Sequence, residues 1–355
     1  MSNLPAPMLI TKKQPRWFTR PLTIIIAAAI IVAIGTVGGV LYMNHWYKAS
    51  LKPLSSEQQR IRVTISEGAD AGQIGKLLQG KGVIRSARSF SRYVDNTHNK
   101  ERLQAGTYLF SPSESVQTIV DMLANGKVDT FNLTLVPGKR LDQIKASLVK
   151  AGFDETQVAT ALAAKYDSPL LADKPASADL EGYIFPDTYQ LNSETTPSQF
   201  FEIALANLYK RVQDEGLIDK LHQRGLNLHQ AFTLASIVQQ EASNADDQRM
   251  VAQVFLSRLQ QNMMLGSDVT AFYASYKAGI ANNISINSPY NTRVNKGLPP
   301  GPIGNFNLSA LEAVANPSNT DYLFFVAGDD GKIYYSHTQA EHEQLTKEYC
   351  TKLCQ

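Results

Sequence analysis

The stretch QAFTLASIVQQEA, residues 230–242, decides the fold of the second half of the chain. Small and apolar side chains recur in it every three or four residues, which predicts a helix with one continuous apolar stripe. The members of that stripe are Ala231, Leu234, Ala235 and Val238. The next place on the stripe is held by Glu241. The spacing therefore predicts a core helix that carries a carboxyl group toward the protein interior.

A carboxyl group in such a position has a defined chemical use. Burial disfavours the ionised form and raises the pKa, so that the group keeps its proton near neutral pH, as a general acid must. The alternative is that Glu241 ends the helix and emerges into solvent, because residues 243–246 (SNAD) are typical of a cap for a following helix over 247–261. The spacing alone leaves both interpretations open.

Downstream of this helix lies a dense polar and proline-rich patch. Two glycines and three prolines in residues 297–303 (GLPPGPI) predict a stiff loop with little conformational entropy left to lose. Hydrogen-bonding side chains precede it at residues 290–293 (YNTR). Such a wall suits a sugar-binding cleft, and it suits a plain connection between subdomains equally well. The candidate binding residues here are Tyr290, Asn291, Thr292, Gly297, Leu298, Pro299 and Pro300.

Upstream, residues 179–189 (DLEGYIFPDTY) form an aromatic and acidic cluster on a predicted loop and strand. Glu181 and Asp187 are its candidates for a second carboxylate beside Glu241. Asp268 is a third candidate, and no spacing in the sequence selects among them. All three are retained as candidate substrate-binding residues.

The patterns in the rest of the chain after residue 60 predict an α+β fold. Short strands and helices alternate over residues 61–136, with strands expected at 62–65, 105–110 and 131–136 and helices starting near residues 74, 87 and 115. Beyond residue 139 the pattern is mostly helical, with helices at 141–148, 155–165 and 198–215. A hairpin is predicted from residues 322–326 and 332–335, joined by GDDG.

The N-terminus differs in character from the remainder. Of 355 residues with a formal net charge of +2, the first 20 contain four basic and no acidic side chains, which leaves the rest at −2. Residues 22–43 form an uninterrupted apolar stretch, long enough to cross the ~30 Å hydrocarbon core of a membrane. The positive-inside rule then places a tail of residues 1–21 in the cytoplasm and leaves a linker at residues 44–60 outside it. A cleavable signal peptide is the alternative, but the apolar run exceeds the usual length.

Several classes of function are disfavoured. The exported part lacks the clustered basic charge of a nucleic-acid binder. Phosphate-loop, zinc-peptidase and serine-hydrolase motifs are absent from the sequence. The six histidines have no partner ligands at metal-binding spacing, so no metal and no cofactor are expected. Cys350 and Cys354 are the only cysteines, which excludes a disulfide framework.

Taken together, these blocks resemble the endolytic murein transglycosylase family, also called YceG-like or MltG. The resemblance covers about residues 60–345. It rests on blocks in a shared order: AGTY (105–108), LVPG (135–138), EGYIFPDTY (181–189), ASIVQQE (235–241), YNT (290–292), GLPPGPI (297–303) and EH (341–342).

The resemblance implies a membrane-anchored enzyme that cleaves nascent peptidoglycan strands between N-acetylmuramic acid and N-acetylglucosamine and leaves 1,6-anhydro ends. It implies a LysM-like module at residues 61–136, a catalytic domain at 137–355 and location in the bacterial inner membrane. Penicillin-binding glycan synthases are the implied partners. A two-carboxylate hydrolytic muramidase and a non-enzymatic glycan-binding scaffold are the alternatives.

Within the family motif the second of two acids is the catalytic one, and that position here is Glu241. The first acid is replaced by Gln239 in this chain. Residues two apart on a helix face different directions, so the resemblance still assigns catalysis to Glu241.

Overall fold

The structure is a computed structural model that describes residues 19–126 and 130–352. Within these residues the chain is a mixed α+β protein that divides into two compact units. Among the described residues, the first contains 19–57, 67–104 and 112–125, and the second contains 58–66, 105–111, 126 and 130–352. The α+β class predicted from the sequence is confirmed.

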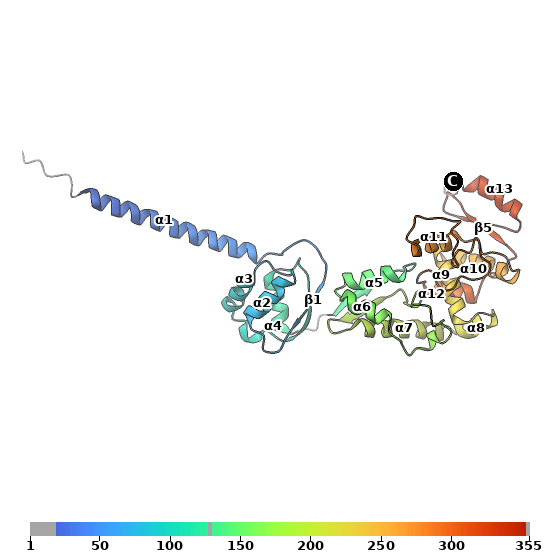
Figure 1. Cartoon of the computed structure of the whole chain (residues 1–355), viewed down its shortest axis with the longest axis horizontal. Coiled ribbons are helices and arrows are strands. Elements are labelled where there is room, and N and C mark those ends of the chain that lie inside the picture. The colour runs from blue at the N-terminus through green and yellow to red at the C-terminus, as the bar shows by residue number, and fades with distance from the viewer. Residues whose placement is uncertain (1–18, 127–129, 353–355) are drawn as a thin grey trace, which may run out of the picture. The chain divides into compact units, whose positions relative to one another are not determined.

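The first helix, α1 (Thr19–Ser50), is the apolar one (Figure 1). Its segment Ile24–Ser50 is long and apolar enough to cross a membrane, and none of its most apolar window is buried. This segment suggests a single-pass membrane anchor. The helix extends beyond the predicted end at residue 43, because nothing up to Ser50 interrupts it.

The remainder of the first unit is a small helical bundle. It consists of α2 (Ala71–Gly80), α3 (Ala87–Asn96), the short η1 (Lys100–Arg102) and α4 (Val116–Asn125). Asp70 and Gln73 start α2 with a capping box. Ile74 and Leu78 of α2 and Phe90 of α3 are buried in its core. The three helices predicted between residues 70 and 125 are confirmed.

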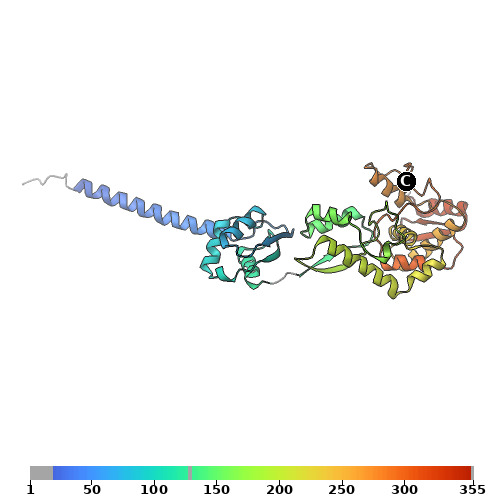
Figure 2. The same cartoon turned by 60° about the horizontal axis from the view of Figure 1, so that its bottom comes forward.

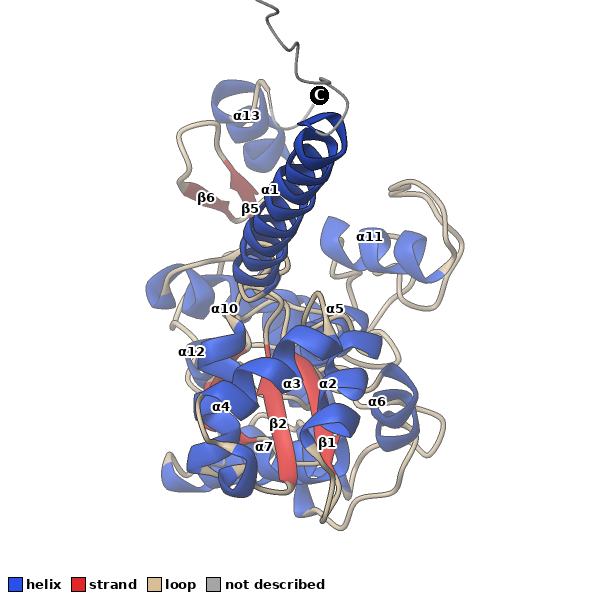
Figure 3. Cartoon of the chain, turned by 90° about the vertical axis from the view of Figure 1, so that its left-hand side faces the viewer, coloured by secondary structure: helices blue, strands red, loops and turns tan. Residues whose placement is uncertain are grey.

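The strands among the described residues form two-stranded antiparallel sheets. They are β1 (Ile61–Ile65) with β2 (Gly106–Phe110), β3 (Thr130–Thr134) with β4 (Thr188–Asn192), and β5 (Phe324–Ala327) with β6 (Ile333–Ser336). Figure 3 shows β1 and β2 side by side. The predicted strands and the predicted hairpin are confirmed. Because β1 and β2 belong to the second unit and the helices between them to the first, the module boundaries at residues 61 and 136 stay a prediction.

The second unit is mostly helical. Its first helices are α5 (Leu141–Lys150), α6 (Glu155–Leu162), α7 (Pro197–Asp214) and α8 (Leu217–Gln223), with the short η2 (Pro169–Leu171) between α6 and β4. They continue with α9 (Leu228–Glu241), α10 (Ala245–Gln260), α11 (Asp268–Lys277), α12 (Leu308–Ala315) and α13 (Gln339–Tyr349). Helix α6 packs against α5 and α7, the green helices of Figure 2.

Helix α9 lies at the centre of this unit, in contact with α8, α10, α11 and α12. Its residues from Leu228 to Val238 are buried except Gln230. The helices predicted at 141–148, 155–165, 198–215, 229–242 and 247–261 are confirmed. Helices α8, α11 and α12 were not predicted, because their short apolar patterns do not extend over the window that periodicity needs.

Candidate active site

Glu241 is the last residue of α9. The helix begins with a capping box in which the side chains of Asn227 and Gln230 each accept a hydrogen bond from the other's backbone N–H. The predicted stripe is completely buried, with Ala231, Leu234, Ala235 and Val238 each 0% exposed. A stripe so buried directs the last turn toward the protein interior, and the Glu241 side chain is half-buried.

The carboxyl group of Glu241 is set to hold a proton near neutral pH. Burial raises the pKa of Glu241 to about 7, a hydrogen bond from Ser267 opposes that rise, and the negative charge of Asp268 adds to it. The Ser267 Oγ donates to Glu241 Oε1 over 2.6 Å. The C-terminal end of α9 also presents partial negative charge, which disfavours a carboxylate there.

Glu241 lines a cavity of about 510 Å³, a size typical of small-molecule sites. Its walls come from α10, from the start of α11, from the loop after α11, from β5 and from α13. The charged and hydrogen-bonding side chains that line it are Glu241, Arg258, Ser267, Asp268, Arg293, His342 and Thr346. Of the predicted site residues, Glu241 and Asp268 are the two that line this cavity.

Asp268 is the first residue of α11 and forms an ion pair with Arg293. Both side chains are partly exposed in the cavity. The pair offsets the charge of Asp268 beside Glu241. Of the three candidates for a second carboxylate, the structure therefore brings Asp268 to the cavity of Glu241, where Asp268 is paired with Arg293.

Asn291 and Thr292 are buried and organise the loop rather than line the cavity. The Asn291 amide donates to the carbonyls of Ile284 and Ile286 over 2.9 and 2.8 Å. The Thr292 Oγ accepts a hydrogen bond of 3.2 Å from the backbone N–H of Ser267. Thr292 therefore holds the backbone of the residue that contacts Glu241.

The proline-rich loop is fixed to the start of α9 through His229, a residue that the sequence did not single out. His229 Nε2 lies 2.9 Å from the Pro300 carbonyl, and its Nδ1 lies 2.9 Å from the Tyr183 hydroxyl. Because a carbonyl only accepts, Nε2 carries the proton and Nδ1 accepts from Tyr183. Gly297 provides a turn at φ +83°, and Leu298 packs against the core.

Tyr290 and Glu181 belong to a second polar cluster, centred on Tyr273 of α11. The rings of Tyr273 and Tyr290 lie 5.0 Å apart. Glu181 is 6% exposed, accepts from the backbone N–H of Leu141 over 2.9 Å and from the Tyr273 hydroxyl over 3.1 Å. Burial raises the pKa of Glu181 to about 7 against these hydrogen bonds. Neither Tyr290 nor Glu181 lines the cavity of Glu241.

Asp187 lies outside both clusters, on the approach to β4. Burial alone would raise its pKa, but hydrogen bonds from Asn207 and Thr188 and the guanidinium of Arg211 hold the pKa of Asp187 below its usual range. The Arg211 Nη2 lies 2.6 Å from Asp187 Oδ2. The structure does not bring Asp187 to Glu241, and its contacts tie β4 to α7.

Gln239 points to α12 rather than to the cavity. Its Oε1 accepts a hydrogen bond of 2.9 Å from the backbone N–H of Asn307, the residue that caps α12. Its neighbour Gln240 donates to the carbonyl of Gly138 over 2.9 Å. The two glutamines therefore hold other segments to α9 and leave Glu241 as the only carboxyl group on its last turn.

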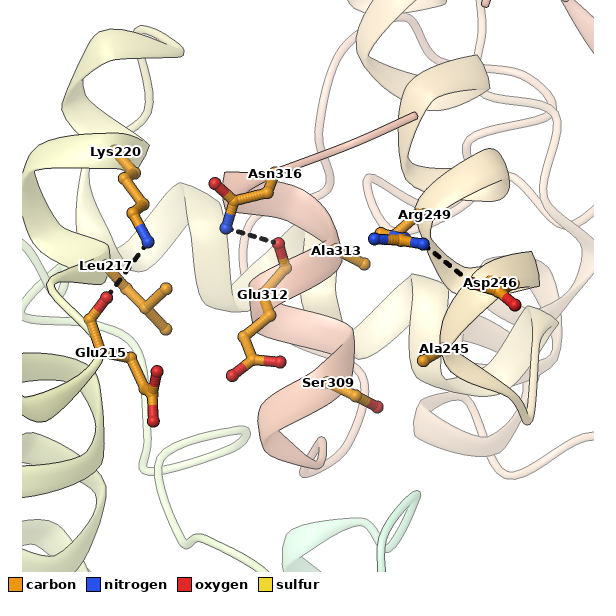
Figure 4. A pocket seen from close by; sticks show the side chains of 10 residues that line it. All are labelled: Glu215, Leu217, Lys220, Ala245, Asp246, Arg249, Ser309, Glu312, Ala313 and Asn316. Atoms are coloured by element: carbon orange, nitrogen blue, oxygen red, sulfur yellow. Dashed lines mark hydrogen bonds and ion pairs between the residues drawn. The ribbon is translucent and has the colours of Figure 1, made fainter. Parts of the chain in front are cut away.

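A second cavity of about 290 Å³ lies between α8, α10 and α12 (Figure 4). It contains none of the predicted site residues. Arg249 in its wall pairs with Asp246 over 2.8 Å, and Lys220 donates to the backbone carbonyl of Glu215. Over the described part of the chain, no three acidic, histidine or cysteine side chains gather as metal ligands do. Cys350 is buried and is not a free thiol, whereas Cys354 lies outside the described residues.

Fold and site together define a class of protein, a mixed α+β chain whose cavity presents one protonatable carboxyl group at the end of its central helix. The chain belongs to the YceG-like family, whose sequence profile matches residues 63–348.

Named relatives agree with this membership. The chain is 31% identical to an endolytic murein transglycosylase of Streptococcus pneumoniae over 92% of its own length, and the match spans 65% of that relative. It is 29% identical to an endolytic murein transglycosylase of Bacillus subtilis, over 85% of this chain and 88% of the relative.

A crystal structure of a putative yceG-like protein from Listeria monocytogenes is similar in fold. The two have a TM-score of 0.52 and 31% sequence identity, over 82% of this chain and all of the other.

Proposed function

We propose that the protein is an endolytic lytic transglycosylase that cleaves peptidoglycan strands between N-acetylmuramic acid and N-acetylglucosamine. The observation that carries the proposal is the geometry of Glu241, a carboxyl group at the wall of a cavity with a pKa raised to about 7. The names of the relatives from Streptococcus pneumoniae and Bacillus subtilis support the same substrate and reaction.

In this mechanism Glu241 acts twice. Its carboxyl proton goes to the glycosidic oxygen as the bond to C1 of the muramic acid breaks through an oxocarbenium-like state. The carboxylate then takes the proton of the C6 hydroxyl, whose oxygen attacks C1 and closes the 1,6-anhydro ring. Glu241 ends protonated, as it began, and no water is consumed.

The hydrogen bond from Ser267 suits this double role. It stabilises the carboxylate form for the interval between the two proton transfers, without lowering the pKa so far that the acid form is lost at neutral pH. The Thr292 hydroxyl accepts from the backbone N–H of Ser267 and so holds Ser267 in place. Tyr290, Asn291 and the loop at residues 297–300 are proposed to shape the approach of the glycan.

A hydrolytic muramidase would need a second carboxylate to activate water or attack C1. Asp268 is the candidate that lines the same cavity as Glu241, but its carboxylate forms an ion pair with Arg293. We therefore assign Asp268 a minor electrostatic part, in which the share of its charge that Arg293 does not offset adds to the rise that burial gives to the pKa of Glu241.

We further propose that α1 anchors the protein in the bacterial inner membrane as a single span with the N-terminus cytoplasmic. The apolar segment of α1 and the four basic residues among the first 20 support this orientation. Residues 61–136 are proposed to form a LysM-like glycan-binding module. Penicillin-binding glycan synthases that supply nascent strands are the proposed partners.

The test is a digestion of purified peptidoglycan with the wild-type chain and with Glu241→Gln. The wild type should release muropeptides with 1,6-anhydro ends, identified by mass spectrometry as products that have gained no water. The folded variant should lose at least about 1,000-fold in rate, as expected for loss of the proton donor together with the proton acceptor. Reducing ends from the wild type would identify a muramidase, and anhydro ends from the variant would remove Glu241 from the mechanism.

A further inference from the structure

One wall of the Glu241 cavity contains two nitrogen-bearing side chains that the proposed mechanism does not use. Arg258 comes from α10 and His342 from α13, and both line the cavity. Both contact the ring of Phe324: the guanidinium carbon of Arg258 lies 4.8 Å from its centroid, and the His342 ring stacks on it at 5.6 Å. Burial lowers the pKa of His342, and the charge of Arg258 is close enough to lower it further.

Arg258 is a partly buried cation without an acidic partner among the described residues. Its Nε donates to the carbonyl of Leu323 over 2.6 Å, and its Nη1 donates to the carbonyl of Leu265 over 2.7 Å. Within the part of the chain that the structure describes, its Nη2 has no acceptor. A buried guanidinium is normally paired with an anion, because neutral carbonyls offset only part of its desolvation.

His342 has an unsatisfied hydrogen-bonding atom on the same wall. Its Nδ1 is buried and has no partner among the described residues. Buried polar atoms without partners are rare in folded proteins and call for an explanation. Since His342 lines the cavity, a rotation of its ring turns this nitrogen toward a ligand there, and one ligand group then accepts from Arg258 and His342 together.

The charges of the cavity favour an anion. Asp268 is offset by Arg293, Glu241 is neutral in the acid form that starts the reaction, and Arg258 then contributes a net positive charge. A carboxylate matches the planar donor geometry of a guanidinium better than a neutral sugar hydroxyl does.

We propose that Arg258 and His342 form a subsite that binds a carboxylate on the side branch of the glycan. The inference rests on the proposed function for the identity of the glycan. In peptidoglycan such a carboxylate has two sources: the stem peptide in intact strands, and the lactyl group of muramic acid in strands from which the peptide has been removed. Either would fix the muramic acid ring beside Glu241.

The test measures dissociation constants of the full-length Glu241→Gln chain in detergent for three glycan oligomers of equal length. The first carries intact peptides, the second carries free lactyl carboxylates, and the third is the second with its carboxyl groups converted to neutral amides. At least one carboxylate-bearing oligomer should bind about 10-fold more tightly than the amide, as for a charge-assisted pair. Which of the two does so identifies the source, and equal affinity for all three overturns the subsite.

Two added substitutions locate the preference. His342→Phe keeps an aromatic ring against Phe324 and removes both nitrogens, and Arg258→Gln removes the charge and keeps an amide donor. In each, the ratio of affinities should fall close to one. His337→Phe is the matched control, because His337 pairs with Asp321 and does not line the cavity. Retention of the preference by both cavity variants would overturn the inference.

Salt dependence provides a readout that needs no cavity substitution. Raising ionic strength from 0.05 to 0.5 M should abolish most of the preference for the carboxylate and leave binding of the amide unchanged. A preference that persists at high salt would also count against the subsite. The two proposals fail separately: anhydro products without a carboxylate preference overturn the subsite alone, and the preference without anhydro products overturns the transglycosylase alone.

Discussion

At the scale of single residues, the central feature is the pairing of Glu241 with Ser267. The periodicity of α9 predicts a core-facing carboxyl group at residue 241, and the structure places it at the edge of that core. Its hydrogen-bond donor lies 26 positions further along the chain, in a segment without periodic pattern. A serine before a short helix has no sequence signal of this role. Spacing therefore named Glu241 as a candidate and left its exposure open, and it gave no indication of its partner.

Ser267→Ala removes that donor, and it should change both the rate and the pH dependence of glycan cleavage. Because the hydrogen bond lowers the pKa of Glu241, its loss should raise that pKa above about 7 and move the alkaline limb of the kcat/KM profile to higher pH. The carboxylate formed after the first proton transfer also loses a charge-assisted bond, so kcat should fall about 10-fold or more. Rates of release of anhydro-muropeptides between pH 5 and 9 provide the measurement.

Ser275→Ala is the control for this prediction. Ser275 is buried in α11, the helix that Ser267 precedes, and its hydroxyl donates to the carbonyl of Ala271. Its substitution should leave the alkaline limb where the wild type has it. An alkaline limb that stays in place or moves down in Ser267→Ala would contradict the assigned role of Ser267.

At the scale of elements, two sequence blocks that lie far apart meet at Gly182. This residue has φ +81°, and a Cβ built on it would lie 2.3 Å from the Cβ of Pro302. The block at residues 181–189 therefore packs directly on the loop at residues 297–303. The sequence indicated that both blocks are unusual, but their contact depends on the tertiary fold and could not be predicted from spacing.

Gly182→Ala should destabilise the protein more than an alanine substitution at a glycine where only the backbone conformation is strained. The new methyl group must displace a proline ring that has no flexible end, in addition to the cost of a positive φ, about 1–2 kcal/mol. We expect a total loss of about 3 kcal/mol or more in the free energy of unfolding, measured by denaturant titration in detergent. Binding of glycan should weaken as well, because the proline-rich loop is displaced.

Gly297→Ala separates the two contributions. Gly297 has nearly the same backbone conformation, at φ +83°, but nothing lies within 4 Å of a Cβ built on it. It should lose only the conformational part, about 1–2 kcal/mol. Equal losses in the two variants would show that the contact with Pro302 carries no strain.

At the scale of the whole molecule, the sequence predicts most of the secondary-structure elements, but it does not predict how they group into compact units. The apolar segment, the α+β class and most helices follow from local patterns of charge and hydrophobicity. The division into units does not, because β1 and β2 come from the N-terminal region and group with the second unit. Candidate acids likewise separate by tertiary position: Asp268 reaches the cavity of Glu241, whereas Glu181 lies in the Tyr273 cluster and Asp187 pairs with Arg211.

At this scale two carboxyl groups, Glu181 and Glu241, contribute stability that is lost as pH rises from about 4.5 to 7, since they keep their protons in the folded state. Burial raises the pKa of both Glu181 and Glu241 from an ordinary 4.5 to about 7. In this range the unfolded chain releases protons that the folded chain retains, so ionisation favours unfolding. For Glu181, which is 6% exposed, the difference amounts to at most about 3 kcal/mol.

Glu181→Gln tests this because glutamine has the same shape and no charge. The lost carboxylate interactions with Leu141 and Tyr273 add an offset that does not depend on pH, so the informative quantity is the slope. The stability of the variant relative to wild type should increase by up to about 3 kcal/mol between pH 4.5 and 8, in denaturant titrations at a series of pH values. Asp187→Asn is the control, because the pKa of Asp187 is lowered rather than raised. The stability that its carboxylate contributes is present above the unfolded pKa and is lost only in acid, so the stability of Asp187→Asn relative to wild type should stay constant between pH 4.5 and 8. If Glu181→Gln is also constant there, the carboxyl group of Glu181 is ionised in the folded protein at neutral pH, and the cluster around Tyr273 stabilises a charge rather than a neutral acid.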